Sequence, residues 1–215
     1  MGANSFGCAL AAFAISAFLI SAHAQELKPL LLPPPRTDAG KPLMVALTQR
    51  QTIRDIKADR LADQTLADLL WAGFGINRPA SRSRTAPSAM NSQEVDLYVA
   101  LPQGLYLYEP QTNALKALIG DDVRPRTGGQ EFARTAPVTL VFVADLSRLA
   151  KVEPDRREFY AAFDAGCICQ NLYLFCASAG LATVVHDLDR APLAKAMKLG
   201  PNQKIIMAQA IGYPK

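Results

Sequence analysis

One run of apolar positions dominates the sequence and predicts a buried helix. Between residues 161 and 179, apolar side chains recur at three- and four-residue spacing on one helix face: Ala161, Ala165, Ile168, Leu172, Phe175, Cys176 and Ala179. The opposite face is hardly polar, so we expect the helix to be covered nearly all round. Gly180 is the predicted stop, because glycine adopts the left-handed conformation after a helix without a steric penalty. An apolar run over 181–185 then leads into a predicted loop with His186 and Asp187. This arrangement suits either a surface on which a ligand binds or a core helix followed by its exit turn.

The rest of the hydrophobic pattern predicts further helices and a sheet. Short helices are predicted at 42–48, 63–73 and 192–199. Strands are predicted at 95–101, 104–108, 136–144 and 205–211, and loops at 76–90 and 121–129. Alternation over 95–101 indicates a half-buried strand, whereas the continuous apolar run over 136–144 is typical of a strand buried on both faces. Asp63 is the predicted N-cap of its helix. The expected fold class is α+β, with a central mixed or antiparallel sheet flanked by helices and a long buried central helix.

The first 41 residues are not expected to belong to the domain. Residues 1–24 are interpreted as a cleaved signal peptide, because their apolar stretch is too short for an ordinary membrane span and Ala22-His23-Ala24 has the A-x-A form of a cleavage site. A retained N-terminal anchor is the alternative. Residues 25–41, with three prolines in series, are predicted to form an extended arm or linker. The domain then covers 42–215, and we expect a periplasmic or secreted protein with no membrane contact after cleavage.

Composition narrows the classes of function. The chain has 215 residues, enough for one domain with a sizeable core, and its net charge of +4 is too small and scattered to indicate nucleic-acid binding. Three arginines of the loop over 76–90 are interpreted as a solvated basic loop or, alternatively, as neighbours of an anion: Arg78, Arg82 and Arg84. They lack aromatic partners, which also argues against nucleic acid.

The cysteines predict neither a disulfide nor a metal site. Cleavage would remove Cys8 and leave three on the long helix: Cys167, Cys169 and Cys176. On a helix, positions two apart point to different sides, and positions seven apart are about 10 Å apart along the axis. Neither pair suits disulfide geometry, and there is no second cluster of ligands for zinc. We expect small buried hydrophobes.

Four segments carry a family pattern. Residues 50–54 are similar to the motif R-R-S-x-R, and residues 70–76 with 84–89 are similar to L-L-W-A-A-x-G-I followed by R-T-A-P-S-A-G. Residues 166–182 are similar to G-x-x-x-Q-N-L-x-L-x-A-x-x-x-G-L-G, and residues 212–214 to a terminal G-Y/H-P. In this order and spacing the chain resembles the nitroreductase superfamily of flavin enzymes. Within it, the branch of SagB-type azoline dehydrogenases is the most similar. The resemblance extends from about Leu43 to Pro214 and implies a nitroreductase-like, FMN-binding domain.

The resemblance implies a homodimer with one FMN in each of two sites at the subunit interface. The implied cofactor-binding residues are Arg50, Gln51, Thr52, Arg54, Pro87, Ser88, Ala89, Asn91, Gly180, Leu181, His186, Asp187 and Lys215. Arg50 and Arg54 supply forked donors for the dianionic phosphate, and the Asn91 amide can pair with the pyrimidine edge. Backbone amides at His186 and Asp187 would face flavin N5 and O4. The alternatives are an exposed basic helix end for 50–54 and a capped turn for 87–91.

Departures from the family pattern leave two functions open. Ala182 and Asp187 replace small or glycine residues near the flavin ring, and Met90 stands where the branch usually has glycine. The sequence ends at Lys215, whereas many relatives continue and add basic phosphate ligands. The first function is an FMN-dependent oxidoreductase that passes two electrons through flavin N5 in a ping-pong cycle, acting on a small-molecule substrate. Its electron donor is open: NAD(P)H, or a substrate that is itself dehydrogenated. The second is a secreted, non-enzymatic scaffold that binds flavin weakly or not at all. No catalytic set of side chains is evident; His186 is a candidate proton donor or a loop histidine without a role.

Overall fold

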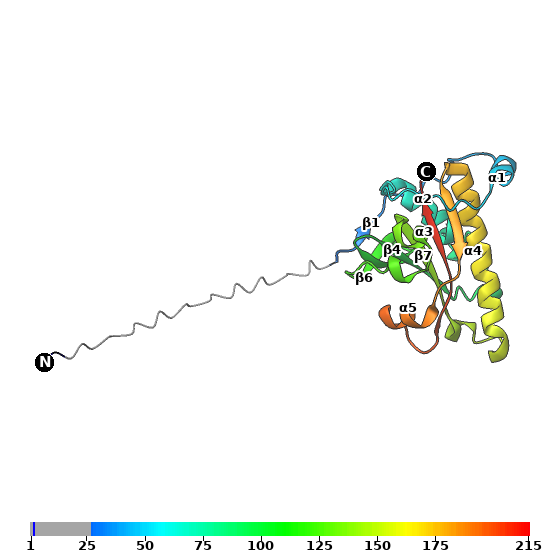
Figure 1. Ribbon diagram of the computed structural model, residues 1–215. Coiled ribbons are helices and arrows are strands. Elements are labelled where there is room, and N and C mark those ends of the chain that lie inside the picture. The colour runs from blue at the N-terminus through cyan, green and yellow to red at the C-terminus, as the bar shows by residue number, and fades with distance from the viewer. Residues whose placement is uncertain (1, 3–26) are drawn as a thin grey trace.

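The computed structural model describes Gly2 and residues 27–215. The predicted signal peptide, Gly2 apart, lies outside the described residues. Within the part of the chain that is described, no helix is both long enough and apolar enough to cross a membrane. The domain is a sheet with helices on both faces, and the long helix α4 runs along one side of it (Figure 1).

Seven strands form the main sheet, in the spatial order β1-β6-β5-β4-β7-β9-β8. Their bounds are Leu30–Leu31 (β1), Val95–Leu101 (β4), Gly104–Glu109 (β5), Ala114–Ile119 (β6), Val138–Asp145 (β7), Ala182–His186 (β8) and Gln203–Gly212 (β9). Every neighbouring pair is antiparallel, so of the two expected sheet types the antiparallel one is present. The central strand β7 is buried on both faces, as its continuous apolar sequence predicts.

The described residues include five α-helices: Leu43–Gln49 (α1), Asp63–Phe74 (α2), Glu131–Thr135 (α3), Arg157–Ala179 (α4) and Arg190–Ala196 (α5). Short 3-10 helices occupy Ala89–Asn91, Arg124–Arg126, Leu146–Leu149 and Pro154–Arg156. Helices α2 and α4 pack on one face, where Leu70 and Leu172 meet Phe142 in the main core. Helix α5 packs on the other face, where Leu193 joins a second apolar cluster.

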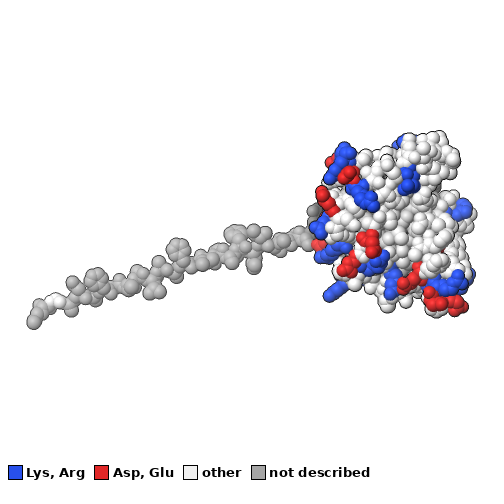
Figure 2. All heavy atoms as spheres, turned by 45° about the vertical axis from the view of Figure 1, so that its right-hand side comes forward, with Lys and Arg blue, Asp and Glu red and all other residues white. Residues whose placement is uncertain are grey.

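The long helix and its glycine stop are confirmed, but the helix is not covered all round. Gly180 has a φ of 71°, and its N–H donates to the Cys176 carbonyl. On the outer face, Phe159 and Phe163 are 66% and 61% exposed, because no described element of the chain covers them. The expectation of nearly complete cover is therefore wrong for the single chain. Figure 2 brings this side forward and shows a broad area that carries few charged side chains.

Other local expectations are corrected. Strand β4 is not half-buried, because its second face packs against the α5 cluster, which buries Tyr98 and Ala100. Strand β6 was not expected. The predicted loop over 76–90 contains a small hairpin, β2 (Ile76–Arg78) with β3 (Ser83–Arg84). The N-cap of α2 is Ala62, while Asp63 is its first helical residue and pairs with Arg60.

The N-terminal arm packs against its own chain. Its strand β1 pairs with β6 at the edge of the sheet. Arg36 binds the buried Asp68 of α2, with Nε to Oδ2 at 2.9 Å and Nη2 to Oδ2 at 2.7 Å. The arm therefore belongs to the fold.

Candidate functional site

The segment after α1 is held at the edge strand β8. Arg50 is the C-cap of α1 and leaves the helix in an extended conformation. Two residues on, Thr52 Oγ1 is 3.2 Å from the Tyr173 hydroxyl of α4, and the Ile53 N–H donates to the Thr183 carbonyl at 3.0 Å. These contacts hold the segment after α1 against β8, and they place the positively charged Arg50 beside that strand.

Tyr173 connects three elements at this place. Its ring lies under the Arg50 guanidinium, whose central carbon is 5.4 Å from the ring centroid, a cation–π geometry. Its hydroxyl accepts the Val185 N–H at 3.0 Å, which satisfies a donor on the open edge of the sheet. Sequence reasoning did not assign Tyr173 a role. The available signal was weak: a tyrosine hydroxyl among the mostly apolar residues of the second half of α4.

A cavity of about 560 Å³ opens beside Arg50. Four of the sequence-predicted site residues line it: Arg50, Gln51, Gly180 and Leu181. Tyr173, Thr183 and Pro214 complete much of the wall. A second cavity of about 660 Å³ adjoins it through Lys41 and Leu181 and is lined by Trp71 and Phe175 among others. The first cavity thus combines a fixed cation, a sheet edge and an apolar floor.

The other predicted cationic residues lie at the margin of this region. Arg54 and Lys215 are exposed. The Lys215 N–H donates to the Asp55 carbonyl at 2.9 Å, while its ammonium is 3.9 Å from Glu131. Among residues 27–215, neither Arg50 nor Arg54 has a carboxylate partner at ion-pair distance. Both therefore keep their donors available for an anion.

Residues 87–91 form a separate turn near the other part of α4. The Ala89 N–H donates to Asp164 Oδ2 at 2.6 Å, and Ser88 Oγ accepts the Gln93 N–H at 2.9 Å. Asp164 and Tyr173 are about 14 Å apart along the helix axis, at about 1.5 Å per residue. Within one chain the predicted site residues therefore fall into two groups, one at Arg50 and Gly180 and one at the turn.

His186 ends β8, so the predicted loop begins only at Asp187. The imidazole lines neither cavity: it packs edge-on against Phe132, with ring centroids 5.4 Å apart, on the face of the sheet away from α4. Burial lowers the pKa of His186. The Asp187 side chain points to solvent, and hydrogen bonds from the Leu188 N–H and Arg190 lower its pKa. The side chains of this pair therefore lie away from both cavities.

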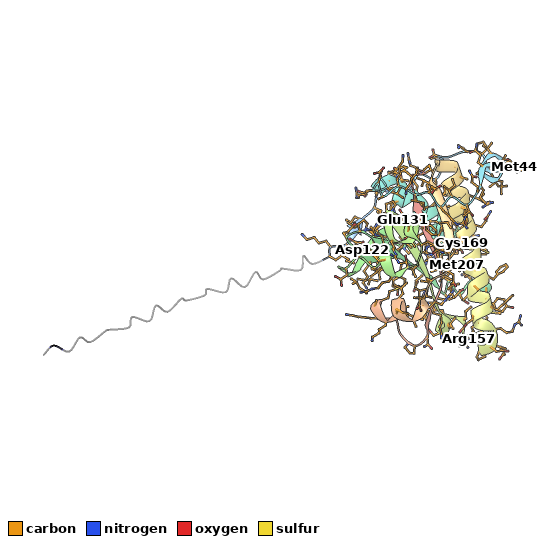
Figure 3. All side chains as sticks on the ribbon, viewed as in Figure 1. Met44, Asp122, Glu131, Arg157, Cys169 and Met207 are labelled. Atoms are coloured by element: carbon orange, nitrogen blue, oxygen red, sulfur yellow. The ribbon has the colours of Figure 1, made fainter. Side chains whose placement is uncertain are left out.

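The cysteines of α4 are free thiols that line the helix–sheet contact. Burial raises the pKa of both Cys169 and Cys176 to about 12, so they stay protonated at neutral pH. Cys169 Sγ lies 3.4 Å from Met207 Sδ, where α4 meets β9 (Figure 3). Among the residues placed by the structure, no group of three or more His, Cys, Asp or Glu side chains could hold a metal ion.

Comparison with known proteins gives the family. A protein-family model, described as the nitroreductase family, matches residues 47–213 of this chain. The chain belongs to the nitroreductase family. A solved structure from Ralstonia eutropha, named as a nitroreductase, is 40% identical and has a TM-score of 0.84, covering 89% of this chain and 91% of that one. The expected family and the antiparallel α+β fold are thus confirmed.

Two further relatives extend the comparison. A Methanocaldococcus jannaschii protein, named as a nitroreductase, is 27% identical over 148 residues, which are 64% of this chain and 74% of that protein. A Desulfovibrio desulfuricans protein solved in complex with FMN has 21% identity and a TM-score of 0.59, covering 82% of this chain and 88% of its own. At this identity the second likeness bears on the fold alone. The family places this protein among the oxidoreductases.

The residues at the first cavity fit the chemistry of FMN. A dianionic phosphate requires forked donors that no carboxylate already occupies, and Arg50 meets this condition. Leu181 and Thr183 bring backbone to the wall of this cavity, where a flat ring with donors and acceptors on its rim could lie. Ala182 points away from this place, into the cluster with Phe132 and Ala210 on the other face. The Ala182 departure therefore does not narrow the cavity.

Proposed function

We propose that this protein is an FMN-dependent oxidoreductase. The observation that carries the proposal is Arg50, a guanidinium without a carboxylate partner among the described residues, held over Tyr173 at a cavity of about 560 Å³ beside an open sheet edge. When bound, FMN would accept a hydride equivalent and pass two electrons onward in a ping-pong cycle. The chain would supply binding, orientation and electrostatics.

Each group of residues has a distinct part in this proposal. Arg50, assisted by Arg54 and Lys215, would bind the phosphate, and Gln51 and Thr52 would hold the ribityl chain. Gly180, Leu181 and the backbone at His186 and Asp187 would border the ring, where amide N–H groups stabilise negative charge that develops on reduction. The His186 imidazole has no part in proton transfer, because it lies on the other face of the sheet.

The turn over 87–91 would complete the site from a second subunit. Within one chain it is separated from Arg50 by about 14 Å along α4. A two-fold axis crossing α4 between Asp164 and Tyr173 would place the turn of one subunit beside Arg50 of the other, because an isologous dimer exchanges equivalent patches. Pro87, Ser88 and Ala89 would then border the ring, and the Asn91 amide would pair with its pyrimidine edge.

The outer face of α4 supports this dimer. Phe159 and Phe163 are exposed there, and Gly166 lies between the two ends of the proposed contact. A Cβ atom at Gly166 would meet no atom of its own chain within 4 Å. A glycine inside a helix is unfavourable by about 1 kcal/mol relative to alanine, so its presence favours close approach of another helix. Helix α1 adds exposed apolar residues, including Met44, which is 72% exposed (Figure 3).

The lining of the second cavity indicates the class of substrate. The second cavity, with Trp71 and Phe175, gives a small apolar or aromatic molecule room beside the flavin position.

Export by a signal peptide would place the protein where no nicotinamide pool is expected, which favours oxidation of a substrate as in SagB-type relatives. We therefore propose a periplasmic or secreted enzyme reduced by its own substrate.

A visible absorbance spectrum tests the proposal. The purified protein is mixed with FMN, desalted and scanned, alongside Arg50→Ala and the control Arg126→Ala, an exposed arginine of the short 3-10 helix Arg124–Arg126 that lines neither cavity. We expect flavin bands in the wild type and in the control, and their loss in Arg50→Ala. A folded wild type without flavin bands would contradict the proposal and favour the scaffold.

A further inference from the structure

Two carboxyl groups are buried together beneath the turn over 88–91. Glu94 precedes β4 and is 0% exposed, and Asp164 of α4 is 2% exposed. Asp164 is the carboxyl neighbour of Glu94, close enough to raise the pKa of Glu94. Neither carboxyl oxygen of Glu94 meets a donor from any other described residue. Ionised carboxylates only accept hydrogen bonds, so two carboxyl groups buried side by side favour a proton between them.

Asp164 connects this pair to the turn. Its Oδ2 accepts the Ala89 N–H at 2.6 Å. The Arg148 guanidinium holds the end of the turn by donating to the Gln93 carbonyl at 3.1 Å. The pair and Arg148 thus fix the turn from two sides.

The turn is strained and needs such support. Met90, Asn91 and Gln93 have φ values of 54°, 53° and 49°, in a backbone region that residues other than glycine seldom adopt. Such strain persists only where surrounding contacts determine the conformation, and it is frequent at functional sites. Loss of the Ala89 bond would therefore release a turn that does not hold its shape alone.

We propose that Glu94 and Asp164 are positioning residues, which hold the turn over 88–91 against α4 through one shared proton. The proton keeps the pair singly charged, so that Asp164 can accept the Ala89 N–H without repulsion from Glu94. The consequence for flavin rests on the proposed function, in which this turn borders the FMN of the other subunit. The consequence for the turn itself does not.

The surrounding charges set the pH at which the proton leaves. Burial, followed by the neighbouring Asp164, raises the pKa of Glu94 to about 7, while Arg148 opposes the rise. Arg148 is itself engaged by Asp96 at 2.7 Å and Asp145 at 3.5 Å, which weakens its effect on Glu94. One turn along α4, burial, followed by the neighbouring Asp164, raises the pKa of the Cys167 thiol. Glu94 is therefore expected to lose this proton close to neutral pH.

The first test follows the Ala89 amide by NMR in the full-length protein without flavin. Spectra are recorded from about pH 5.5 to about pH 8.5, a range that brackets the expected midpoint. We expect the Ala89 resonance to titrate near neutrality. The step should vanish in Glu94→Gln, which is neutral at every pH and can donate to Asp164, and persist in the control Glu153→Gln, an exposed residue. An Ala89 resonance that does not titrate in the wild type overturns the proposal, without need of any variant.

The second test measures FMN affinity over the same pH range by flavin fluorescence. We expect the dissociation constant of the wild type to rise several-fold above neutrality and that of Glu94→Gln to stay flat. Equal pH dependence in both proteins would overturn the link between pair and cofactor. If no FMN binds at any pH, the proposed function fails, while the Ala89 titration still decides whether the pair holds the turn.

Discussion

Gly166 allows a sharp test of the proposed dimer. It lies in the interior of α4, is exposed, and would offer open space to a Cβ atom within its own chain. If the chain acted alone, Gly166→Ala would therefore stabilise it by about 1 kcal/mol, the helix preference for alanine. A leucine at this place would also be harmless, because it would extend into solvent.

In the dimer the same leucine would be costly. Forcing extra methylene groups into a packed contact destabilises by about 1–3 kcal/mol, and a two-fold axis makes each substitution count twice. We therefore expect Gly166→Leu to weaken the dimer by about 2–6 kcal/mol, a rise in its dissociation constant of about 30-fold or more. Flavin should be lost together with the dimer.

Sedimentation equilibrium over a range of concentrations measures this change, with circular dichroism to confirm that the subunit stays folded. Gly129→Leu is the matched control, because Gly129 also has open space around its Cβ position but lies in the loop before α3. A Gly166→Leu protein that dimerises as tightly as the wild type would refute the reasoning, and so would a wild type that is monomeric.

Three further predictions concern stability, and urea unfolding measures each. Gly73→Ala should destabilise the chain by up to about 2 kcal/mol, because the added Cβ would lie 2.8 Å from Leu172 Cδ2 in the core, at a cost of about 1–3 kcal/mol that exceeds the gain of about 1 kcal/mol from the helix preference for alanine; a clear gain in stability would contradict this packing. Met90→Gly should stabilise it by up to about 1 kcal/mol through relief of the positive φ, and a loss would show that the turn is not strained. Because the pKa of Glu94 is raised to about 7, the folded chain binds this proton more tightly than the unfolded chain, so stability should fall between about pH 4.5 and about pH 7; Glu94→Gln should remove that part of the slope.

The fold was predictable where local chemistry and tertiary structure agree. The stop at Gly180 follows from backbone freedom alone, and the apolar sequence of β7 leaves no solvent face. The burial of β4 was not predictable, because alternation marks one covered face and cannot reveal that distant α5 buries Tyr98 on the other. The exposure of Phe163 was missed for the converse reason: an apolar helix face can be covered by another copy of the chain.

The candidate site divides in the same way. Family motifs pointed to Arg50 and Gly180, which the structure brings to one cavity. The motifs could not show that residues 87–91 lie elsewhere in the same subunit, because order in the sequence does not state which subunit completes a site. The alternation of β8 decides which face His186 occupies, and its assignment to a loop hid that information. Tyr173 and Glu94 gain their roles only from contacts with distant segments.

The most direct test of the account asks whether one flavin site is built from two subunits. Arg50→Ala and Asn91→Gly are each expected to lose flavin; glycine keeps the positive φ at 91 while it removes the amide. When the two variants are mixed, dissociated and reassociated, each mixed dimer should contain one doubly altered site and one intact site. We predict that flavin absorbance returns on mixing, to about one quarter of the wild-type level if half of the dimers are mixed. No recovery, with mixed dimers demonstrated by differently tagged subunits, would contradict the shared site.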